Sequence, residues 1–419
     1  MNVIIAPKRL FGSIDAIPSK SHAHRLLIAQ KLARIQGQSR GDGLVIPAFS
    51  QDIAATKNCL LQMDKAMPFL DCKESGSTLR FLLPVAMALK EEAVFIGSGK
   101  LPDRPISPLK EEMEAHGCRF RTDSGQQSSD RYREICTIDG RLQPGEYQLA
   151  GNISSQFITG LLFALPLLEG DSILTLTTPL ESAGYVDLTL EVLLRFGIEV
   201  VESSTREGLR VYQVAGRQRY REPEGLTIEG DWSNAAFWLA CGALDGEITV
   251  GNLNPASSQR DKEILPILER MGAEVIIAGH RVTCRGSGLK RAEVSVAQTP
   301  DLVPVLAAVM SLAEGASLIT NAERLKIKES DRLKTVFDSL SRLGADISYG
   351  GSGLSLTGQP FLQGGETEGH NDHRIVMAAA VASCGCRNPV IIRGAEAVRK
   401  SYPDFFKDFA ALGGNVKEY

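Results

Sequence analysis

A pattern of hydrophobic and polar positions returns along this chain. It is an apolar stretch with helical spacing, then a glycine, then a run that begins like a strand. The glycines of the five clearest copies are Gly117, Gly197, Gly272, Gly344 and Gly413, which are 80, 75, 72 and 69 residues apart. Glycine just after a helix readily adopts the left-handed conformation that ends it. The pattern therefore predicts five helices that each end at one of these glycines.

The expected helices also begin alike. Asp187, Asp261, Asp331 and Asp404 lie 9 to 13 residues ahead of the corresponding glycine. An acidic side chain there caps the helix or complements its positive N-terminus. A sixth, degraded copy is expected to start at Asp52.

Strand-like runs separate the expected helices. They are rich in β-branched and aromatic residues and lie at 93–96, 172–176, 247–250 and 389–392. Strands that alternate with helices in this way predict an α/β fold. The repeating unit is a βαβ-type module used about six times.

Composition sets the size and class of the protein. With 419 residues, of which 43% are hydrophobic and 23% charged, the chain exceeds the usual size of one core, so two domains are expected. It lacks a basic region followed by a long apolar stretch at its start, and no run of about 18 apolar residues occurs. We therefore expect a soluble, cytoplasmic protein that does not bind membranes.

Cysteine and histidine give no sign of a metal site. The 8 cysteines are scattered, with one Cys384-Gly385-Cys386 pair and no C-x-x-C motif, which predicts buried free thiols. His22 and His24 have a spacing that metal ligands use, but no third ligand is near them in the sequence. No bound metal is expected.

Cationic residues gather in five short motifs, although the chain has 46 Lys plus Arg against 50 Asp plus Glu. The motifs are Pro18-Ser19-Lys20-Ser21-His22-Ala23-His24-Arg25, Asp103-Arg104-Pro105, Lys328-Glu329-Ser330-Asp331-Arg332, Asn371-Asp372-His373-Arg374 and Arg399-Lys400-Ser401-Tyr402-Pro403-Asp404. A chain with this overall balance has no general attraction to nucleic acid. Local cations beside helix starts suit a small, multiply charged anion, and so indicate an anion-handling enzyme.

Each motif also has a plainer interpretation. The segment from Lys20 to Arg25 fits an ordinary basic helix start, and 151–157 (Gly-Asn-Ile-Ser-Ser-Gln-Phe) fits an ordinary helix cap as well as a phosphate cradle. The segment 328–332 fits an exposed charge run, or a carboxylate flanked by two cations that exchanges a proton with a substrate.

A nucleotide cofactor is not expected. Gly97-Ser98-Gly99-Lys100 looks like a phosphate-binding loop, but Val94 stands in place of its first glycine and Leu101 in place of the magnesium-binding hydroxyl. Pro102 stands where a dinucleotide fingerprint needs glycine, so both ATP and NAD are disfavoured.

With these motifs in this order, over essentially its full length, the chain resembles the 5-enolpyruvylshikimate-3-phosphate synthase family of the shikimate pathway. The resemblance implies an α/β (α+β) fold, a two-domain inside-out barrel in which each domain has three βαβαββ repeats. Two crossover segments act as the hinge between domains 17–229 and 1–16 plus 230–419.

The resemblance also implies the site residues. Shikimate 3-phosphate would contact Lys20, Ser21, Arg25, Ser154, Ser155, Gln156, Ser182 and Tyr185, with Asp301 and Lys328 facing its ring hydroxyls. Phosphoenolpyruvate would contact Lys20, Gly76, Arg104, Gln156, Arg332, Arg374 and Lys400.

The reaction that the resemblance implies is transfer of the enolpyruvyl group to the 5-hydroxyl of shikimate 3-phosphate, through a tetrahedral intermediate that loses phosphate. Asp301 would accept the hydroxyl proton and Glu329 would protonate the methylene carbon of phosphoenolpyruvate, with Lys20 beside them. No cofactor is implied, and the family suggests a monomer that glyphosate inhibits.

The chain departs from the family pattern beside one site. Where the family usually has Asn-x-Gly-Thr-x-x-Arg, this chain has Glu74, Gly76, Ser77 and Arg80, with Phe81 where proline is common. Glu74 adds negative charge beside an anion site, so these positions bear on the affinity for phosphoenolpyruvate and glyphosate.

Two other functions compete with this interpretation. A UDP-N-acetylglucosamine enolpyruvyl transferase shares the fold and half of the reaction, but needs a reactive cysteine ahead of the Arg-Pro motif, and 99–103 contains none. A non-catalytic anion-binding or RNA-binding repeat protein would use the same helix ends, but has no need of Asp301 and Glu329. An assay of phosphate release distinguishes the three.

Overall fold

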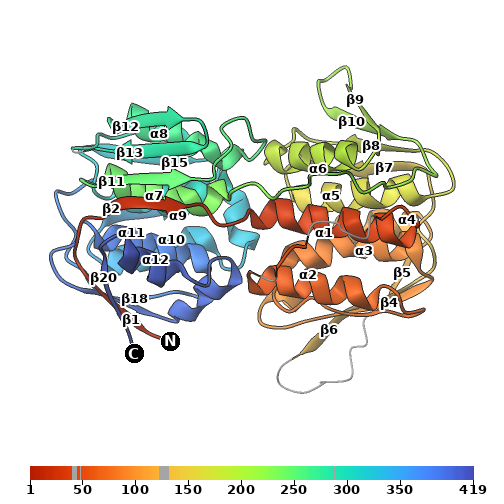
Figure 1. Ribbon diagram of the computed structural model, residues 1–419, viewed down its shortest axis with the longest axis horizontal. Helices are drawn as coiled ribbons and strands as arrows, with labels where there is room; N and C mark the ends of the chain where they lie inside the picture. The colour runs from red at the N-terminus through yellow and green to blue at the C-terminus, as the bar shows by residue number, and fades with distance from the viewer. Residues whose placement is uncertain (40–44, 48, 122–131, 287) are drawn as a thin grey trace. The chain divides into compact units, whose positions relative to one another are not determined.

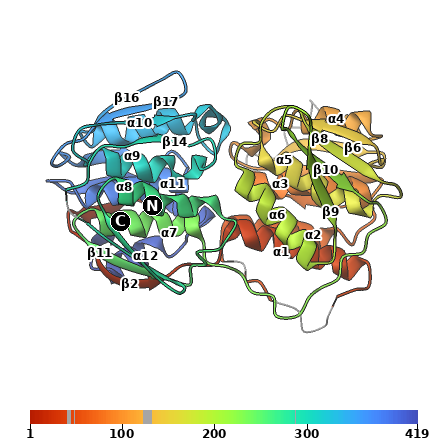
Figure 2. The ribbon, with the colours of Figure 1, turned by 90° about the horizontal axis from the view of Figure 1, so that it is seen from above.

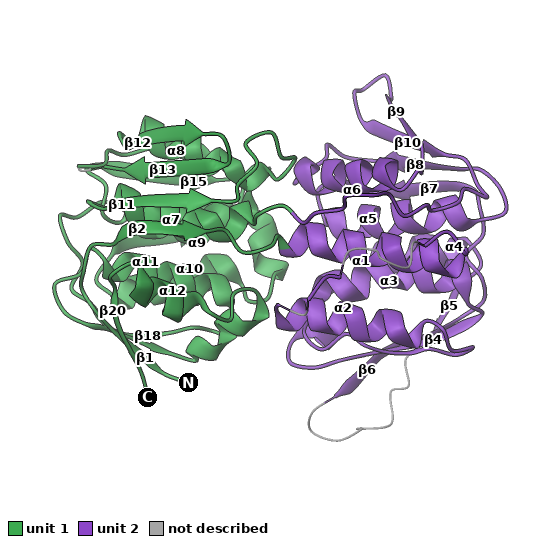
Figure 3. Ribbon diagram, viewed as in Figure 1, with its two compact units in different colours: residues 1–19, 229–419 green, residues 20–228 purple. Residues whose placement is uncertain are grey.

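The computed structural model describes residues 1–39, 45–47, 49–121, 132–286 and 288–419. The chain forms two compact units (Figure 3). Unit 1 comprises Met1–Ser19 and Glu229–Tyr419, and unit 2 comprises Lys20–Ile228. The functional domains 17–229 and 1–16 plus 230–419 stay a prediction.

Helices and strands alternate along most of both units. In unit 2 they are α1 (Lys20–Ile35), α2 (Gln51–Gln62), β3 (Phe69–Asp71), α3 (Gly76–Leu89), β4 (Glu92–Gly97), α4 (Leu109–Ala115), β5 (Arg119–Arg121), β6 (Arg133–Asp139), β7 (Glu146–Leu149), α5 (Ser155–Ala164), β8 (Ser172–Leu176), α6 (Ala183–Arg195), β9 (Val200–Ser204) and β10 (Arg210–Val214). The four strand-like runs of the sequence lie in β4, β8, β11 and β19, so these four predicted strands are confirmed.

Unit 1 has β1 (Val3–Ala6), β2 (Phe11–Asp15), α7 (Trp232–Ala243), β11 (Glu247–Gly251), α8 (Ile264–Arg270), β12 (Glu274–Ala278), β13 (Arg281–Arg285), β14 (Glu293–Ser295), α9 (Val303–Met310), β15 (Ala316–Thr320), α10 (Arg332–Arg342), β16 (Asp346–Gly350), β17 (Gly353–Thr357), β18 (Gly365–Glu368), α11 (His373–Ser383), β19 (Val390–Arg393), α12 (Phe405–Ala411) and β20 (Asn415–Glu418). Short 3-10 helices occur at η1 (Leu101–Asp103), η2 (Leu165–Leu167), η3 (Arg260–Glu263), η4 (Pro300–Leu302), η5 (Glu323–Ile327) and η6 (Ala395–Lys400).

Every sheet in the described residues is one copy of a βαβαββ module. The strand orders are β3-β4-β6-β5, β7-β8-β10-β9, β12-β13-β11-β2, β14-β15-β17-β16 and β18-β19-β1-β20. In each sheet the first two strands of the βαβαββ module pair in parallel, as β2 does with β11. The other pairs are antiparallel, as for β11 with β13 (Figure 1). Strand β1, at the start of the chain, completes the last sheet beside β20. The repeat that the sequence predicts is confirmed in these five copies.

The five repeat glycines end helices as predicted. Their φ angles lie between +76° at Gly197 and +104° at Gly272. In each copy the next N–H reaches back to the carbonyl five residues earlier, as from Ile198 to Leu193 at 2.9 Å and from Ala273 to Leu268 at 3.0 Å. This is the Schellman arrangement, which satisfies carbonyls at a helix end.

The predicted acidic helix starts are correct only in part. Asp331 caps α10 by accepting from the N–H of Lys334 at 3.2 Å. Asp404 stands at the start of α12 without a capping bond from its side chain. Asp187 lies inside α6, which begins after Ser182, so its prediction as a helix start is wrong.

Two more helix starts complete this comparison. Asp261 lies in the first turn of η3, which runs directly into α8, and its carboxylate accepts from the Ser233 hydroxyl of α7. The sixth helix, α2, begins at Gln51 next to Asp52, as expected for the degraded copy, with Ser50 as its cap. An acidic side chain near a helix start can therefore bond to a partner far away in the sequence, and the sequence does not identify that partner.

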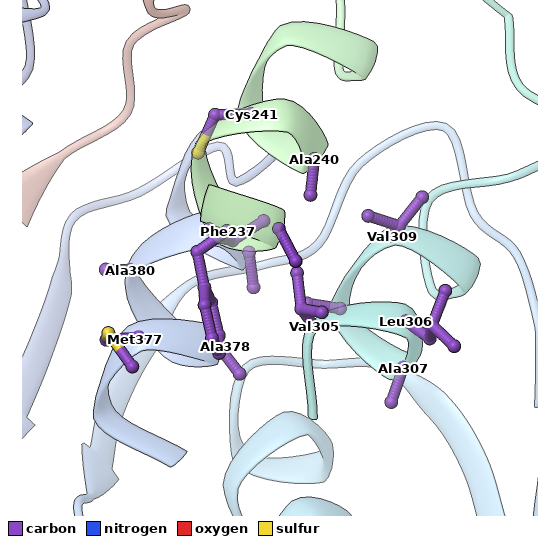
Figure 4. Packing of buried hydrophobic residues seen from close by; sticks show 14 of the residues in the cluster. Phe237, Ala240, Cys241, Val305, Leu306, Ala307, Val309, Met377, Ala378 and Ala380 are labelled. Atoms are coloured by element: carbon purple, nitrogen blue, oxygen red, sulfur yellow. The ribbon is translucent and has the colours of Figure 1, made fainter. Parts of the chain in front are cut away.

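The core of unit 1 lies between the first helices of its three modules. All residues of α9 and α11 are buried, as are nearly all of α7. Side chains such as Phe237, Val305 and Met377 meet where these three helices pack together (Figure 4). A helix that is apolar on all sides belongs inside a core, so the sheets and second helices lie outside it. Figure 2 shows this for α10 with β16 and β17.

Two general findings complete the fold. Among the described residues, no helix is long and apolar enough to cross a membrane. All eight cysteines are free thiols, and seven of them are buried, with Cys384 half-buried. The prediction of buried free thiols is therefore confirmed except at Cys384.

Candidate active site

The predicted site residues form separate clusters in the two units, and each cluster begins at helix N-termini. In unit 2 the first is Lys20, the first residue of α1. Its ammonium lies 2.8 Å from the Asp52 carboxylate of α2, and both side chains are 14% exposed. Asp52 thus holds the Lys20 ammonium at a defined place at the start of both helices.

Arg25 lies one turn later on α1 and is 2% exposed. Its guanidinium donates to the carbonyls of Ser21 and Tyr185, both at 2.7 Å, and to the hydroxyls of Thr189 at 2.8 Å and Thr159 at 3.4 Å. Four of its five N–H groups thus have a hydrogen-bond partner among the described residues. Burial lowers the pKa of Arg25 to about 9, so it stays charged at neutral pH.

The predicted serines stand at two neighbouring helix starts. Ser154 caps α5 by accepting from the N–H of Gln156 at 3.3 Å, so the predicted cap is confirmed. Ser182 precedes α6 in the left-handed conformation, with φ of 55°. The two preceding loops are joined, because the N–H of Glu181 donates to Gly151 at 3.1 Å. Ser154, Ser155 and Ser182 are all buried and stand at N-termini, where anions bind favourably.

Gly76 and Arg104 are in direct contact. Gly76 is the first residue of α3, and a Cβ built on it would lie 2.6 Å from Nη1 of Arg104. Any larger residue would therefore move the guanidinium. The Arg104 guanidinium donates no hydrogen bond to another residue in the described parts of the chain, although its backbone N–H donates to Leu101 at 3.1 Å.

Gln156, in α5, connects the helix that begins at Gly76 to the helix capped by Ser154. Its carbonyl accepts from Arg80 at 2.8 Å, and its amide donates to Ser77 at 2.9 Å. Both partners belong to α3, so the N-termini of α3 and α5 are fixed to one another. Arg80 is 4% exposed and was not among the predicted site residues. Arg80 matches the arginine of the family pattern Asn-x-Gly-Thr-x-x-Arg, and this match could have identified it from the sequence.

In unit 1, one carboxylate meets three cations. Asp301, in η4, accepts from Arg332 Nη1 at 2.7 Å and from Arg374 Nη2 at 3.3 Å, and it lies 3.6 Å from the Lys328 ammonium. These cations come from the start of α10, the segment before it, and the start of α11. The structure thus brings together residues up to 73 positions apart.

Arg332 is the centre of this cluster and is 1% exposed. Besides Asp301, it donates to Glu329 at 2.6 Å and, through Nε, to Asp372 at 2.8 Å. Although burial opposes its charge, Asp372, Glu329 and Asp301 together raise the pKa of Arg332. One guanidinium therefore holds the two carboxylates, Asp301 and Glu329, for which proton transfer was predicted.

Asp372 belongs to the same cluster and was not among the predicted site residues. It is fully buried, caps α11, and accepts from the Ser330 hydroxyl at 3.0 Å as well as from Arg332. It thereby fixes the starts of α10 and α11 together. Asp372 stands inside a motif quoted for its arginine, but its long-range partners cannot be seen in the sequence.

Lys400 approaches the same helix start from η6. Its ammonium donates to the carbonyl of Asn371 at 2.7 Å, and the side chain is buried. His370 and Asn371 have φ angles of 52° and 54°, which residues other than glycine rarely adopt. This turn directs the Asn371 carbonyl to Lys400.

Two groups of this cluster have unusual acidity. Burial lowers the pKa of Lys328 to about 8, and Arg332 and Arg324 add to this, while Asp301 opposes it. Burial also raises the pKa of Asp261 to about 6; the Asp301 charge adds to this, whereas Arg374 and the bond from Ser233 oppose it. Shifted pKa values clustered around one buried group of cations are typical of sites that transfer protons.

No group of three or more His, Cys, Asp and Glu side chains in the described ranges could hold a metal ion. His24 donates to or accepts from Thr56 at 2.7 Å within unit 2, and burial lowers its pKa. The predicted site residues that lie together in each unit carry cationic, hydroxyl and carboxylate groups. These groups hold anions and move protons.

Comparisons with known proteins agree on one family. The profile of the EPSP synthase (3-phosphoshikimate 1-carboxyvinyltransferase) family matches residues 50–409. A 3-phosphoshikimate 1-carboxyvinyltransferase of Clostridium kluyveri is 41% identical over 436 residues, covering 100% of this chain and 98% of that protein. One of Clostridioides difficile is 38% identical, covering 99% of this chain and 98% of that protein.

Solved structures share the fold. An EPSP synthase from Acinetobacter baumannii has a TM-score of 0.74 at 24% identity, with 100% of both chains covered. The enolpyruvyl transferase NikO from Streptomyces tendae has a TM-score of 0.70 at 17% identity, with 99% of this chain and 98% of that chain covered. The α/β fold predicted from the resemblance is thus confirmed, and the chain belongs to the EPSP synthase (3-phosphoshikimate 1-carboxyvinyltransferase) family.

Proposed function

We propose that this protein transfers the carboxyvinyl group of phosphoenolpyruvate to the 5-hydroxyl of shikimate 3-phosphate, releases phosphate, and so serves the shikimate pathway. Family membership supports the reaction class. The observation that carries the proposal is the shared guanidinium of Arg332, which donates to Asp301 at 2.7 Å and to Glu329 at 2.6 Å. One cation thereby holds two carboxylates that can act as proton acceptor and proton donor.

The addition step needs both carboxylates. Asp301 accepts the proton of the 5-hydroxyl as the oxygen bonds to C2 of phosphoenolpyruvate, and Glu329 gives a proton to C3, which becomes a methyl group. Glu329 must be protonated for this role. A bound anion close to Arg332 favours that form, because it adds negative charge beside the Glu329 carboxylate.

Elimination reverses the proton movements. The methyl group of the tetrahedral intermediate returns a proton to Glu329, the C–O bond to phosphate breaks, and the departing phosphate takes the proton from Asp301. Lys328 lies 3.6 Å from Asp301, so its ammonium is placed to stabilise negative charge on the same oxygen atoms. The net change is one C–O bond formed and one broken, with no redox step.

The remaining residues hold the substrates in this proposal. Ser154, Ser155 and Ser182 receive the shikimate phosphate at two helix N-termini, with Lys20, Ser21, Arg25, Gln156 and Tyr185 around the rest of that substrate. Gly76, Arg104, Arg332, Arg374, Lys400, Lys20 and Gln156 receive phosphoenolpyruvate. Arg104 suits this role because its guanidinium donates to no other residue in the described ranges.

We also propose that the protein acts as a cytoplasmic monomer on these two small molecules, without nucleic acid. Neither a UDP-N-acetylglucosamine enolpyruvyl transferase nor a non-catalytic binding protein is favoured by any feature of the clusters. The described loop 99–103 ahead of Arg104 carries no cysteine.

The test is release of inorganic phosphate from phosphoenolpyruvate with shikimate 3-phosphate, compared with UDP-N-acetylglucosamine and with no acceptor. Release only with shikimate 3-phosphate is expected. Glu329→Gln should lower kcat by about 10²–10⁴-fold, the usual contribution of a positioned acid or base. Glu323→Gln, an exposed acid in the preceding η5, is the matched control and should retain full rate. Phosphate release with UDP-N-acetylglucosamine, or with no acceptor, would contradict the proposal.

A further inference from the structure

The two segments that connect the units run side by side within unit 1. The chain leaves unit 1 after Ser19 and re-enters it at Glu229. Pro18 and Gly230 form an antiparallel bridge, the N–H of Ser19 donates to Glu229 at 2.7 Å, and the N–H of Asp231 donates to Ile17 at 2.8 Å. All covalent connection between the units passes through this pair of segments.

The side chain of Gln259, which is 7% exposed, joins both segments. Its carbonyl oxygen accepts from the Ser19 hydroxyl at 3.0 Å and from the Trp232 N–H at 3.2 Å. Its amide nitrogen donates to the Gly230 carbonyl at 3.0 Å and to the Glu229 carboxylate at 3.1 Å. The amide nitrogen also lies 3.3 Å from the Ser257 hydroxyl, so both acceptor positions and both N–H donors of the Gln259 amide have partners here.

Other side chains hold the second segment from the same side. Glu229 also accepts from the Asn254 amide at 2.7 Å and from the Ser257 hydroxyl. Asp231 caps α7 by accepting from the Asn234 N–H at 2.8 Å. The second segment thus has several anchors, and the first is held by a bond from Ser19 to Gln259 and by the Asn252 amide, which donates to the Ala16 carbonyl at 3.3 Å. Ser19 is fully buried, which makes the loss of that bond costly.

We propose that Gln259 is a positioning residue for Lys20. Ser19 is joined to Lys20 by one peptide bond, and Lys20 begins the helix that carries the first cationic motif. By holding Ser19 beside Gly230, Gln259 fixes the backbone from which the Lys20 side chain extends, and so the position of the Lys20 ammonium. The inference rests on the proposed function, in which Lys20 contacts both substrates.

The consequence is an effect on catalysis that exceeds the effect on substrate capture. The serines proposed to hold the shikimate phosphate lie in unit 2, away from Gln259 in the chain, so the Kd of shikimate 3-phosphate should rise by a smaller factor than kcat falls. A misplacement of about 1 Å in a reacting arrangement costs about 100-fold in rate. A loosened Ser19 should therefore lower kcat by about 10- to 100-fold.

Gln259→Met tests this, because it keeps the length of the side chain and removes its hydrogen bonds. The matched control is Thr367→Val, which removes another fully buried hydrogen bond of unit 1, that of Thr367 with Ser339 at 2.8 Å. For both variants we would measure thermal unfolding, kcat, and the Kd of shikimate 3-phosphate by calorimetry. The expected result is destabilisation of both variants, a loss of kcat only in Gln259→Met, and a Kd within about threefold of wild type.

Ser19→Ala extends the test and replaces it if Gln259→Met does not fold. It removes one of the bonds of Gln259, so it should lower kcat by itself, and the double variant should be no worse than Gln259→Met alone. Equal kcat losses in Gln259→Met and Thr367→Val, or a wild-type rate in Ser19→Ala, would overturn the positioning role. A wild-type protein that releases no phosphate would instead refute the proposed function.

Discussion

Lys328 is expected to set the alkaline limit of activity. Its side chain is 22% exposed and its ammonium lies 3.6 Å from the Asp301 carboxylate; burial, together with the charges of Arg332 and Arg324, lowers its pKa from 10.5 to about 8. This lowering of the pKa corresponds to about 3 kcal/mol between the charged and neutral forms. At neutral pH the ammonium is still the main form, but it loses its proton just above the physiological range.

The sign of the effect on activity follows from the need for a cation beside Asp301. In the free enzyme, kcat/KM should fall about tenfold for each pH unit above about 8, because the neutral amine cannot stabilise negative charge there. Bound substrate anions favour the ammonium, so the corresponding fall in kcat should appear at higher pH. Rate profiles from pH 6.5 to 10 at low and saturating substrate separate the two.

Stability should change in the opposite sense. The pKa of Lys328 is lowered on folding, so between about pH 8 and 10.5 the unfolded chain binds more protons than the folded chain at this residue. The free energy of unfolding of wild type, relative to Lys328→Met, should therefore rise with pH over that range by up to about 3 kcal/mol. Urea unfolding at several pH values measures it.

Two variants decide the assignment. Lys328→Arg keeps a cation that does not titrate in this range, so the fall in kcat/KM near pH 8 should disappear, whatever the absolute rate. Lys334→Arg, at an exposed position on α10 where Lys334 pairs with Asp338, is the control and should keep the wild-type profile. A profile that is flat to pH 9.5 in wild type, or that still falls near pH 8 in Lys328→Arg, would refute this reasoning.

Four further outcomes are expected. Asp301→Asn should fold but lose about 10²–10⁴-fold in kcat, and a variant that keeps more than about a third of the wild-type rate would disprove its role as proton acceptor. Gly76→Ala should raise both the KM of phosphoenolpyruvate and the inhibition constant of glyphosate, because the new Cβ would lie 2.6 Å from Arg104 Nη1; unchanged constants in a kinetic assay would contradict this. Gly197→Ala should lower the free energy of unfolding by about 1 kcal/mol with normal kcat, since φ is +76° and nothing lies within 4 Å of the added methyl. Denaturant titration measures this loss. Unchanged stability would argue against backbone strain at this helix end. Activity should survive exhaustive treatment with EDTA, and loss that a divalent ion restores would show a metal requirement.

The sequence by itself determined the repeating module and the family. Helix ends at Gly117, Gly197, Gly272, Gly344 and Gly413 were predicted correctly because a left-handed C-terminal residue is a local requirement. The strand-like runs were predicted for the same reason, since β propensity and turn residues act over a few positions. The motifs around Lys20, Arg104, Lys328 and Arg374 identified the family because they are contiguous.

Tertiary structure alone decided which charges meet and how they behave. The bond from Arg332 to Asp372 joins residues 40 positions apart, and that from Ser19 to Gln259 joins residues 240 apart. The Asp261 carboxylate accepts from a hydroxyl 28 residues away. Burial, which sets the pKa of Lys328, is a property of the packed chain and not of its neighbours in sequence. Local conformational preferences can therefore be read from the chain, whereas pairing and desolvation of charged groups depend on contacts between distant segments.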